Sequence, residues 1–303
     1  MAKIKSVLRN IFILDILNCI KEIKMENFQS TWKSSDGLDI FAQGWIPDSL
    51  SPRAVICLVH GLGEHTLRYS NVAEVLTKEG FVLFGADLRG HGNSEGPRGH
   101  FPSIEIVLQD IDLLLEHARK RYPGLPVILY GHSLGGILVL YYGLKHKPDV
   151  KCIISTSSGL HTALEEQPFK IMAAKVLGSL MPFKTIPSGL DVNAISHDTE
   201  VVTLYKKDPL VHDKISLGFG KIMLKVTRWT LEHAGEFSLP LLLLHGKADT
   251  IAYPSSSIEF AASLNGKCKL VTWDDAYHEL HNELIKDEVF KTLIVWIEEH
   301  LNL

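Results

Sequence analysis

The amino-acid sequence predicts an α/β protein with a doubly wound, mostly parallel sheet of eight strands and one helical insertion. Two observations lead to this fold class. Short apolar runs alternate with amphipathic helical patterns along most of the chain, as is typical of parallel strands whose connecting helices cover both faces of a sheet. The alternation stops between residues 157 and 238, a stretch too long for a simple crossover loop. We therefore expect this stretch to form a cap.

The expected strands begin with a hairpin. Residues 28–32 and 38–45 alternate in polarity around Ser34-Ser35-Asp36-Gly37, which predicts an antiparallel edge of the sheet. The core is expected to comprise residues 26–156 and 239–303. Its apolar runs predict strands at 54–59, 81–86, 126–130, 150–155, 240–245 and 268–273, and its helical patterns lie at 69–79, 104–121, 137–146, 255–264 and 283–300.

Ser133 is the first candidate functional residue. It stands in Gly131-His132-Ser133-Leu134-Gly135, directly after the apolar run 126–130 and before the helical pattern. A serine on a sharp strand-to-helix turn is held in a strained, exposed position, and small residues two places away let the chain segments pass. The helix N-terminus behind it favours developing negative charge. The pattern in this context predicts a nucleophilic serine.

A base and an acid follow Ser133 in the order that this architecture requires. Asp249 follows the apolar strand 240–245, and His278 follows the strand 268–273. A serine hydroxyl is a poor nucleophile at neutral pH, so it needs both partners. We expect His278 to take the proton from Ser133 and later give it to the leaving group, and Asp249 to orient the imidazole and stabilise its charged form.

Alternatives stay open for both partners. Asp274 and Asp275 are closer in sequence to His278 than Asp249 is, so either could be the orienting acid, and His281 is a rival base. Asp249 is favoured because it closely follows a strongly apolar strand, and ligands in open α/β sheets bind at the carboxyl edge of the strands.

The chemistry also needs donors for an oxyanion. The strand 54–59 ends in His60-Gly61-Leu62-Gly63-Glu64-His65, and in this architecture one donor comes from such a loop and the other from the residue after the nucleophile. We therefore expect the main-chain N–H groups of Leu62 and Leu134 to form the oxyanion hole.

Two charged pairs near these loops are interpreted as structural. Asp87 and Arg89 follow the strand 81–86 in a glycine-rich turn and are expected to tie loops together. Glu64 and Arg68 are four residues apart near a helix start, where an ion pair is expected.

Taken together, these motifs resemble those of the monoacylglycerol lipase and lysophospholipase group of the α/β-hydrolases. The resemblance covers about residues 26 to 300 and is carried by His60–His65, Asp87–Gly96, Gly131–Gly136 and Ala276–His281 in this order. It implies the α/β-hydrolase fold, a triad of Ser133, Asp249 and His278, and an oxyanion hole at Leu62 and Leu134. It also makes Tyr205 and His132 candidates for substrate binding, with Tyr205 as a polar contact for a glycerol head group.

The resemblance implies a serine hydrolase that cleaves monoacylglycerols to fatty acid and glycerol through an acyl-enzyme, with no metal or organic cofactor. A lysophospholipase and a short-chain carboxylesterase are the alternatives within this enzyme class. A ligand receptor that reuses the hydrolase body is the alternative from another class, because fold does not imply function.

The expected cap offers one apolar helix. Within 169–181, apolar residues form a helical stripe at Phe169, Met172, Ala173, Val176 and Leu180, widened by Ile171, Leu177 and Met181. Part of this stripe is expected to pack on the core. A broad stripe with two methionines above Ser133 also suits a lid that lines an acyl-chain tunnel and touches membranes with its outer surface.

The partner that the resemblance implies is a small lipid ester, and composition argues against other classes of partner. The net charge of -4, without a run of five like charges or a basic patch, gives no support for nucleic-acid binding. Of the four cysteines, Cys57, Cys152 and Cys268 lie in or beside expected strands without a C-x-x-C pair. This pattern fits reduced core thiols rather than a metal site or a disulfide framework. We expect a cytoplasmic protein with peripheral membrane contact.

Residues 1–25 predict an amphipathic N-terminal helix. Lys3, Lys5 and Arg9 precede the apolar run 11–17, but Asp15 interrupts that run. The run is therefore a poor secretory signal and too short to span a membrane. The helix is expected either to dock on the protein body or to lie on a membrane surface.

Overall fold

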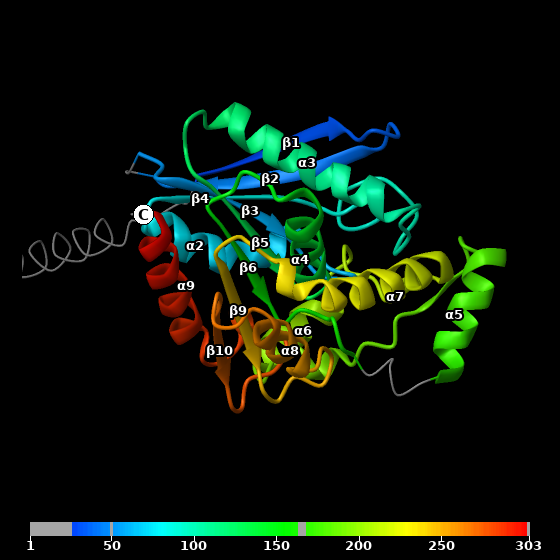
Figure 1. Cartoon of the computed structure of the whole chain (residues 1–303). Coiled ribbons are helices and arrows are strands. Elements are labelled where there is room, and N and C mark those ends of the chain that lie inside the picture. Colours follow the sequence, from blue (N-terminus) through cyan, green and yellow to red (C-terminus); the bar gives the residue numbers. More distant parts are fainter. Residues whose placement is uncertain (1–25, 49–50, 163–167, 302–303) are drawn as a thin grey trace, which may run out of the picture.

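The computed structural model describes residues 26–48, 51–162 and 168–301. The N-terminal helix expected within 1–25 lies outside the described residues. An eight-stranded sheet in the order β1-β2-β4-β3-β5-β6-β9-β10 runs through the molecule (Figure 1). Its strands are β1 (Glu26–Lys33), β2 (Asp39–Ile46), β3 (Ala54–Val59), β4 (Phe81–Ala86), β5 (Val127–His132), β6 (Cys152–Thr156), β9 (Leu241–Gly246) and β10 (Lys269–Trp273).

The sheet has the mixed direction that the sequence predicts. β1 and β2 form an antiparallel hairpin, and β2 pairs antiparallel with β4. All strands from β4 to β10 across the sheet pair in parallel. Parallel pairing brings the carboxyl ends of β3, β5, β6, β9 and β10 to one edge, so the loops that follow them meet there.

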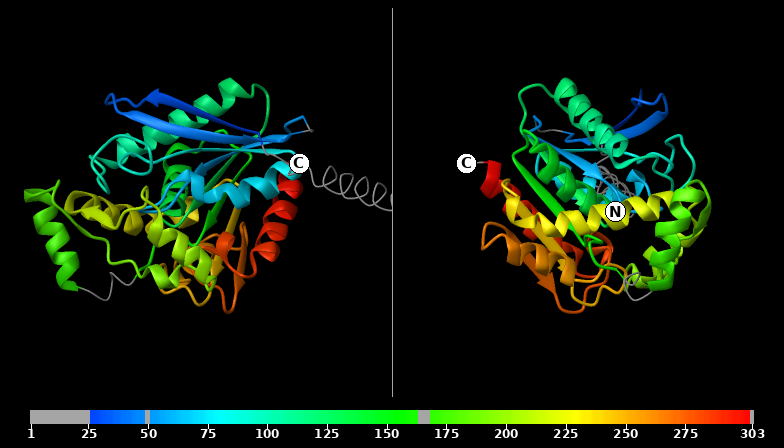
Figure 2. Two further views of the ribbon diagram at one scale, coloured as in Figure 1. Left: turned by 180° about the vertical axis from the view of Figure 1, so that it is seen from behind. Right: turned by 45° about the vertical axis from the view of Figure 1, so that its right-hand side comes forward.

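Alternating residues of the buried strands face two separate cores. On β3, Val55, Cys57 and Val59 belong to one apolar cluster, and Ala54, Ile56 and Leu58 belong to the other. The first cluster lies beneath α3 (Ile104–Arg121), α4 (Leu134–His146) and α8 (Ser255–Ser263), and the second beneath α2 (Ser70–Lys78) and α9 (Lys286–Leu301). Both faces of β3, β4, β5, β6 and β9 are buried, which explains why these strands appear in the sequence as continuous apolar runs. The two layers of helices are visible in Figure 2.

The chain between β6 and β9 forms the elements of the expected cap. They are α5 (Pro168–Leu180), β7 (Thr185–Pro187), η3 (Val192–Ala194), α6 (Thr199–Lys207), β8 (Lys214–Ser216), α7 (Leu217–Glu232) and η4 (Ala234–Glu236). β7 and β8 pair antiparallel. α7 packs on α4 and on α5, and α5 lies at the periphery beyond α7, away from the sheet (Figures 1 and 2). The expected apolar helix 169–181 thus corresponds to α5.

Some boundaries differ from the sequence expectation. The helix expected at 69–79 divides into the 3-10 turn η1 (Thr66–Tyr69) and α2. α4 begins three residues earlier than expected, at Leu134, because the helix starts directly at the serine turn. α9 begins three residues later than expected, at Lys286. Glu283 lies in a turn before it, where its carboxylate accepts hydrogen bonds from the main-chain N–H groups of Tyr277 and Leu284.

No helix among the described residues has the length and apolarity needed to cross a membrane.

Candidate active site

Ser133 lies on a strained turn between β5 and α4. Its backbone has φ 54° and ψ −113°, a conformation that non-glycine residues rarely adopt. A Cβ atom on Gly131 would lie 2.2 Å from the carbonyl oxygen of Gly135, and a Cβ on Gly135 would lie 1.9 Å from the carbonyl oxygen of Val59. Glycines two residues before and after Ser133 are therefore required for the turn to close against β3.

The side chains of Ser133, His278 and Asp249 form one hydrogen-bonded chain. His278 Nε2 lies 2.9 Å from Ser133 Oγ, and His278 Nδ1 lies 2.7 Å from Asp249 Oδ2. An ionised carboxylate only accepts hydrogen bonds, so Nδ1 carries the proton in the neutral imidazole. Nε2 is then free to accept the proton of the Ser133 hydroxyl. The arrangement is that of a nucleophile, a base and an orienting acid.

Asp249 is almost completely buried, and its carboxylate accepts three hydrogen bonds, from two main-chain N–H groups and from His278. Its Oδ1 accepts the N–H groups of Ile251 and Ala252 at 2.8 and 2.9 Å. Its Oδ2 faces His278 and also His245 Nε2, which lies 3.3 Å away. Burial alone raises the pKa of Asp249, but the two histidines outweigh burial and hold this pKa far below its ordinary value. Asp249 therefore stays ionised beside His278.

His278 has a pKa shifted in the opposite direction. Burial lowers it, but the charge of Asp249 and its hydrogen bond raise it more, and Glu279 and Glu64 add smaller increases. The loop that carries His278 is fixed from behind, because Ser157 Oγ donates a hydrogen bond of 2.7 Å to the main-chain oxygen of His278. Ser157 itself has a positive φ of 46° and is anchored to β9 through Leu244.

The loop after β3 approaches Ser133 from the other side. His60 fixes this loop through its two ring nitrogens, because Nε2 accepts the N–H of Leu88 at 2.8 Å and Nδ1 donates to the carbonyl oxygen of Gly61 at 2.8 Å. Among the hydrogen bonds of the described residues, none is donated by the main-chain N–H of Leu62 or Leu134. The oxyanion hole expected at these two N–H groups stays a prediction.

The structure separates the alternative candidates from Ser133. Asp274 pairs with Lys247 at the surface, and its side chain is 81% exposed. Asp275 is exposed as well. His281 is buried, but its ring stacks on Tyr69 with centroids 4.7 Å apart instead of meeting the Ser133 hydroxyl. Of the acids and bases that the sequence left open, only Asp249 and His278 join Ser133 in one chain of hydrogen bonds.

A buried ionic cluster borders the triad. Arg68 binds Glu279 with two hydrogen bonds of 2.9 and 2.6 Å, and it lies 3.4 Å from Glu64. Its guanidinium also covers the ring of Tyr205, 4.3 Å from the ring centroid. We call Glu64, Arg68, Glu279 and Tyr205 the Arg68 cluster. The sequence predicted the pair of Glu64 and Arg68, but Arg68 makes its shorter contacts with Glu279, 211 residues away.

Tyr205 and His132 occupy different places around the triad. Tyr205, at the end of α6, approaches the loop after β3, because its hydroxyl lies 3.7 Å from the position that a Cβ on Gly63 would take. His132 is buried between His278 and His281, with ring centroids 5.0 Å from each, and its Nδ1 contacts Thr156 Oγ1 at 3.0 Å. Burial lowers the pKa of His132 strongly, so its ring is neutral.

Two residues of this region were missed by the sequence reasoning. Glu279 directly follows His278, and His245 precedes Asp249 by four residues at the end of β9. Their adjacency to the triad was the available signal. The buried partner of Glu279 is Arg68, 211 residues away, whereas His245 contacts Asp249 and Ala252 in the loop that follows its own strand.

Two further sequence expectations for this region agree with the structure, the role of Asp87 between loops and the unpaired cysteines. Asp87 ties the loops together by accepting hydrogen bonds from Thr66 and Asn93. Cys57, Cys152 and Cys268 are free thiols. Among the described residues, no group of three or more His, Cys, Asp or Glu side chains is placed to hold a metal ion.

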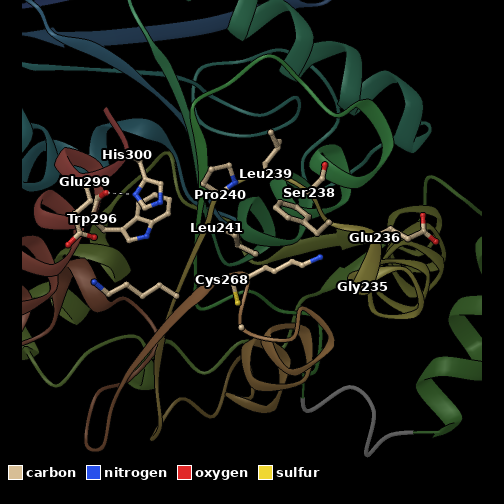
Figure 3. A pocket seen from close by; sticks show the side chains of 14 residues that line it. Gly235, Glu236, Ser238, Leu239, Pro240, Leu241, Cys268, Trp296, Glu299 and His300 are labelled. Carbon is tan, nitrogen blue, oxygen red and sulfur yellow. Dashed lines mark hydrogen bonds between the residues drawn. The ribbon is translucent and has the colours of Figure 1, made fainter. Parts of the chain in front are cut away.

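A separate cavity of about 720 Å³ lies at the opposite edge of the sheet (Figure 3). Its walls include Pro240 at the start of β9, Cys268 before β10, and Trp296 and His300 on α9. Ser133, Asp249 and His278 follow the carboxyl ends of their strands, whereas this cavity lies at the amino ends of β9 and β10. It therefore takes no part in the arrangement around Ser133.

Known proteins with similar sequences and structures place this geometry in context. The family described as serine aminopeptidase, S33, matches residues 50–285. An abhydrolase domain-containing protein of Dictyostelium discoideum is 38% identical over 283 residues, which make up 91% of this chain and 30% of that relative. The monoacylglycerol lipase of Mycolicibacterium smegmatis is 32% identical, over 88% of this chain and 95% of the relative. The crystal structure of the Paleococcus ferrophilus monoacylglycerol lipase has a TM-score of 0.77 and 30% identity, and covers 91% of this chain and 100% of the other.

Proposed function

The chain belongs to the serine aminopeptidase S33 family of α/β-hydrolases and is a carboxylic ester hydrolase, and we propose that it cleaves monoacylglycerols to fatty acid and glycerol. The observation that carries this proposal is the hydrogen-bonded chain Ser133–His278–Asp249, with its 2.9 and 2.7 Å contacts, at the edge of the buried Arg68 cluster. Two relatives of similar length named monoacylglycerol lipase or monoglyceride lipase, at 32% and 30% identity, support the substrate class.

In the first half of the proposed reaction, Ser133 is acylated. Ser133 Oγ forms a bond to the ester carbonyl carbon while its proton moves to His278 Nε2. The electron pair of the carbonyl bond moves to the carbonyl oxygen. This oxygen accepts hydrogen bonds from the main-chain N–H groups of Leu62 and Leu134. When the tetrahedral intermediate collapses, the bond to the glycerol oxygen breaks, and that oxygen takes the proton from His278. Asp249 stabilises the imidazolium between these two steps.

In the second half, water releases the fatty acid. A water molecule takes the place of glycerol, gives a proton to His278 and attacks the acyl carbon. The bond to Ser133 Oγ then breaks, and Ser133 recovers its proton. The ester and one water molecule are the only reactants needed to balance the two halves of the proposed reaction.

The leaving alcohol is proposed to bind beside His278, because His278 must protonate it. Tyr205 and His132 are the candidate contacts. Tyr205 supports the proposal through its position between Arg68 and the loop of Leu62, and His132 through its packing against His278.

The cap, with proposed bounds 157 and 238, is inferred to guide the acyl chain and to touch lipid. The proposed lipid contact is supported by the surface of α5 and of the segment that follows it. Large apolar side chains are exposed there: Met172, Val176, Leu177, Leu180, Met181 and Phe183. Contiguous exposed apolar side chains mark interaction surfaces. We propose a cytoplasmic protein that meets its substrate at a membrane or droplet surface through this face.

A hydrolysis panel tests the proposed substrate class. The wild-type protein and Ser133→Ala would be assayed with monoacylglycerols, lysophospholipids and p-nitrophenyl esters of increasing acyl length. The proposal expects the highest kcat/KM for long-chain monoacylglycerols and a loss of at least about 10⁴-fold in Ser133→Ala. Preference for lysophospholipids, preference for acetyl esters, or binding of a lipid without turnover would each contradict it and would indicate a lysophospholipase, a short-chain carboxylesterase or a receptor, respectively.

A further inference from the structure

Asp249 lies between two imidazole rings, and the proposed reaction uses only one of them. His278 Nδ1 lies 2.7 Å from Asp249 Oδ2, and His245 Nε2 lies 3.3 Å from the same oxygen. His245 stands near the end of β9, four residues before Asp249. The side chains of His245 and Asp249 are both 0% exposed, so bulk water has no access to the contact between them.

The partners of His245 determine which of its ring nitrogens donates. Besides its contact with Asp249, Nε2 lies 2.9 Å from the main-chain oxygen of Ala252. A carbonyl oxygen and an ionised carboxylate only accept hydrogen bonds, so Nε2 carries a proton. Nδ1 lies 2.8 Å from the hydroxyl of Ser257 on α8, a group that can donate or accept. His245 thus presents an N–H to Asp249 on the nitrogen opposite to the one that His278 uses.

His245 also fixes the loop that holds the other oxygen of the carboxylate. Asp249 Oδ1 accepts the main-chain N–H groups of Ile251 and Ala252 at 2.8 and 2.9 Å. The main-chain oxygen of the same Ala252 accepts the N–H of His245. Ala252 is therefore held through its N–H by Asp249 and through its carbonyl group by His245.

These contacts restrict the orientation of the carboxylate. A carboxylate has about four acceptor positions on its two oxygens. Three are used by the N–H groups of Ile251, Ala252 and His278, and His245 supplies a fourth N–H at 3.3 Å. Burial raises the pKa of Asp249, whereas His278 and His245 both lower it. Rotation of the carboxyl group would break several of these contacts at once.

From this arrangement we infer that His245 is a positioning residue, which keeps the carboxylate of Asp249 directed toward His278 and does not touch the reacting atoms. The inference rests on the proposed ester hydrolysis, because only that reaction gives Asp249 its role. Among the described residues, the hydrogen bonds of the His245 ring go to Ser257 and Ala252. Any effect of His245 on Ser133 must therefore pass through the loop and carboxylate of Asp249.

Glutamine and asparagine separate the two nitrogens of His245. A glutamine amide can place an N–H where Nε2 lies, whereas the shorter asparagine amide reaches only the place of Nδ1. The full-length variants His245→Gln and His245→Asn would be assayed with a dissolved short-chain p-nitrophenyl ester. We expect kcat/KM to stay within about threefold of wild type in His245→Gln and to fall by about tenfold to a hundredfold in His245→Asn, as for the loss of a hydrogen bond to a charged group.

A role of the ring in packing alone predicts a different order. Asparagine keeps the contact with Ser257 and glutamine loses it, so a packing role would make His245→Gln at least as harmful as His245→Asn. Equal losses in the two variants, or a larger loss in His245→Gln, would overturn the inference. Urea unfolding of both variants would show that folded proteins are compared.

A double-mutant cycle tests whether His245 acts through Asp249. His245→Asn would be combined with Asp249→Asn, which removes the carboxylate that His245 is inferred to orient. The double variant should then have the kcat/KM of Asp249→Asn to within about twofold, because nothing is left for His245 to position. Losses that multiply would show that His245 acts independently of Asp249 and would overturn the inference.

Ser257→Ala is the matched control. It removes the partner of His245 Nδ1 and leaves the N–H on Nε2 with both of its acceptors. This variant should keep kcat/KM within about threefold of wild type. A loss as large as that of His245→Asn would assign the effect to packing against α8 and would overturn the inference.

The protonation of the ring can be measured without relying on a variant that folds. NMR of the wild-type protein with isotopically labelled histidine would show which nitrogen of His245 carries a proton. We expect a proton on Nε2. A ring protonated on Nδ1 alone would have no N–H to offer Asp249 and would overturn the inference.

The same assays distinguish the inference from the proposed function. If the wild type hydrolyses no ester and its Ser133 is not labelled by a fluorophosphonate, the proposed function itself is refuted. If the wild type is active and His245→Asn is equally active, only the role of His245 is refuted.

Discussion

The imidazole of His278 lies between opposing influences on its pKa. Burial lowers this pKa, whereas Asp249 raises it above the ordinary value, with smaller contributions from Glu279 and Glu64. A general base acts only when it is unprotonated. In the proposed mechanism, the reactivity of Ser133 therefore depends on the charges that surround His278.

The raised pKa of His278 predicts a specific acid limb in the pH profile. His278 keeps its proton up to a higher pH than an ordinary histidine. The value of kcat/KM should therefore reach its maximum above the pKa of His278 and should fall as the pH drops through that pKa. This acid limb should lie above the ordinary histidine pKa of about 6.5. The measurement is kcat/KM for a soluble p-nitrophenyl ester between pH 4.5 and 9. An acid limb below about 6 would contradict the electrostatic assignment.

The substitution Asp249→Asn should reverse the direction in which the pKa of His278 is shifted. Without the carboxylate, burial dominates and lowers the pKa of His278, so the acid limb should move to lower pH. The rate at neutral pH should fall by about 10⁴-fold, because the amide no longer enforces the tautomer with Nδ1–H. A variant that lost activity but kept the wild-type acid limb would show that Asp249 does not control the titration of His278.

The residue scale also shows where sequence reasoning reached its limit. Ser133, Asp249 and His278 could be proposed because each follows an apolar strand, and the strand ends of a parallel sheet meet at one edge. Their catalytic roles stay predictions until they are measured. Glu279 and His245 were missed although both are close in sequence to a triad residue, because adjacency alone does not show the contacts that they make with Arg68 and Asp249.

At the scale of elements, a buried ionic network joins three segments around the first hairpin. Arg89, in the loop after β4, is 1% exposed and pairs with Asp110 on α3 at 2.7 Å and with Asp36 in the β1–β2 turn at 2.8 Å. Arg89 lowers the pKa of Asp36 to about 2. Burial raises the pKa of Asp110, and Arg89 opposes that increase. The network therefore depends on one guanidinium.

Arg89→Leu should destabilise the fold strongly. The change leaves the carboxyl group of Asp110 buried without its cation, and breaking a buried pair in this way costs about 3–5 kcal/mol. Urea unfolding at pH 7 would measure the loss. Lys247→Ala is the control, because it breaks the exposed pair with Asp274 and should leave the unfolding midpoint unchanged. Equal effects of the two substitutions would contradict the assigned importance of burial.

The cap shows which elements a sequence pattern can and cannot reveal. α5 was predicted because its apolar residues recur with helical spacing, although the structure leaves Met172, Val176 and Leu180 exposed. The short pair β7–β8 and helices α6 and α7 were not predicted. β7 and β8 have three residues each, too few for a periodicity to appear. α7 packs on α4 and buries Phe219, Met223 and Val226 in the main apolar core. This burial depends on tertiary packing, which the sequence pattern of α7 does not reveal.

The exposed face of α5 gives a prediction about interfacial activity. Val176→Glu combined with Leu180→Glu places two charges on side chains that are 51% and 73% exposed, so the fold should be little affected. Hydrolysis of emulsified long-chain monoacylglycerol should fall about tenfold, because charged side chains resist burial at a lipid surface, while hydrolysis of a dissolved short-chain ester should be unchanged. Equal activity of variant and wild type on the emulsion would remove α5 from the proposed lipid contact.

At the scale of the whole molecule, strand order determines which loops meet. β5 lies beside β6, and β6 lies beside β9 and then β10, so the loops carrying Ser133, Asp249 and His278 emerge side by side although 145 residues separate the first from the last. The alternation of strands and helices made this topology predictable. The path of the cap across the loops was not predictable, because it depends on contacts such as that of His212 with Gly63.

Covalent labelling of the nucleophile tests the central claim most directly. The full-length protein would be treated with a fluorophosphonate, and the adduct would be measured by intact mass and located by peptide mapping. The account predicts one adduct on Ser133 in the wild type, none in Ser133→Ala, and labelling slowed by several orders of magnitude in His278→Ala. An adduct on another residue, or labelling of the His278→Ala variant at the wild-type rate, would show that this hydroxyl is not activated by the imidazole beside it.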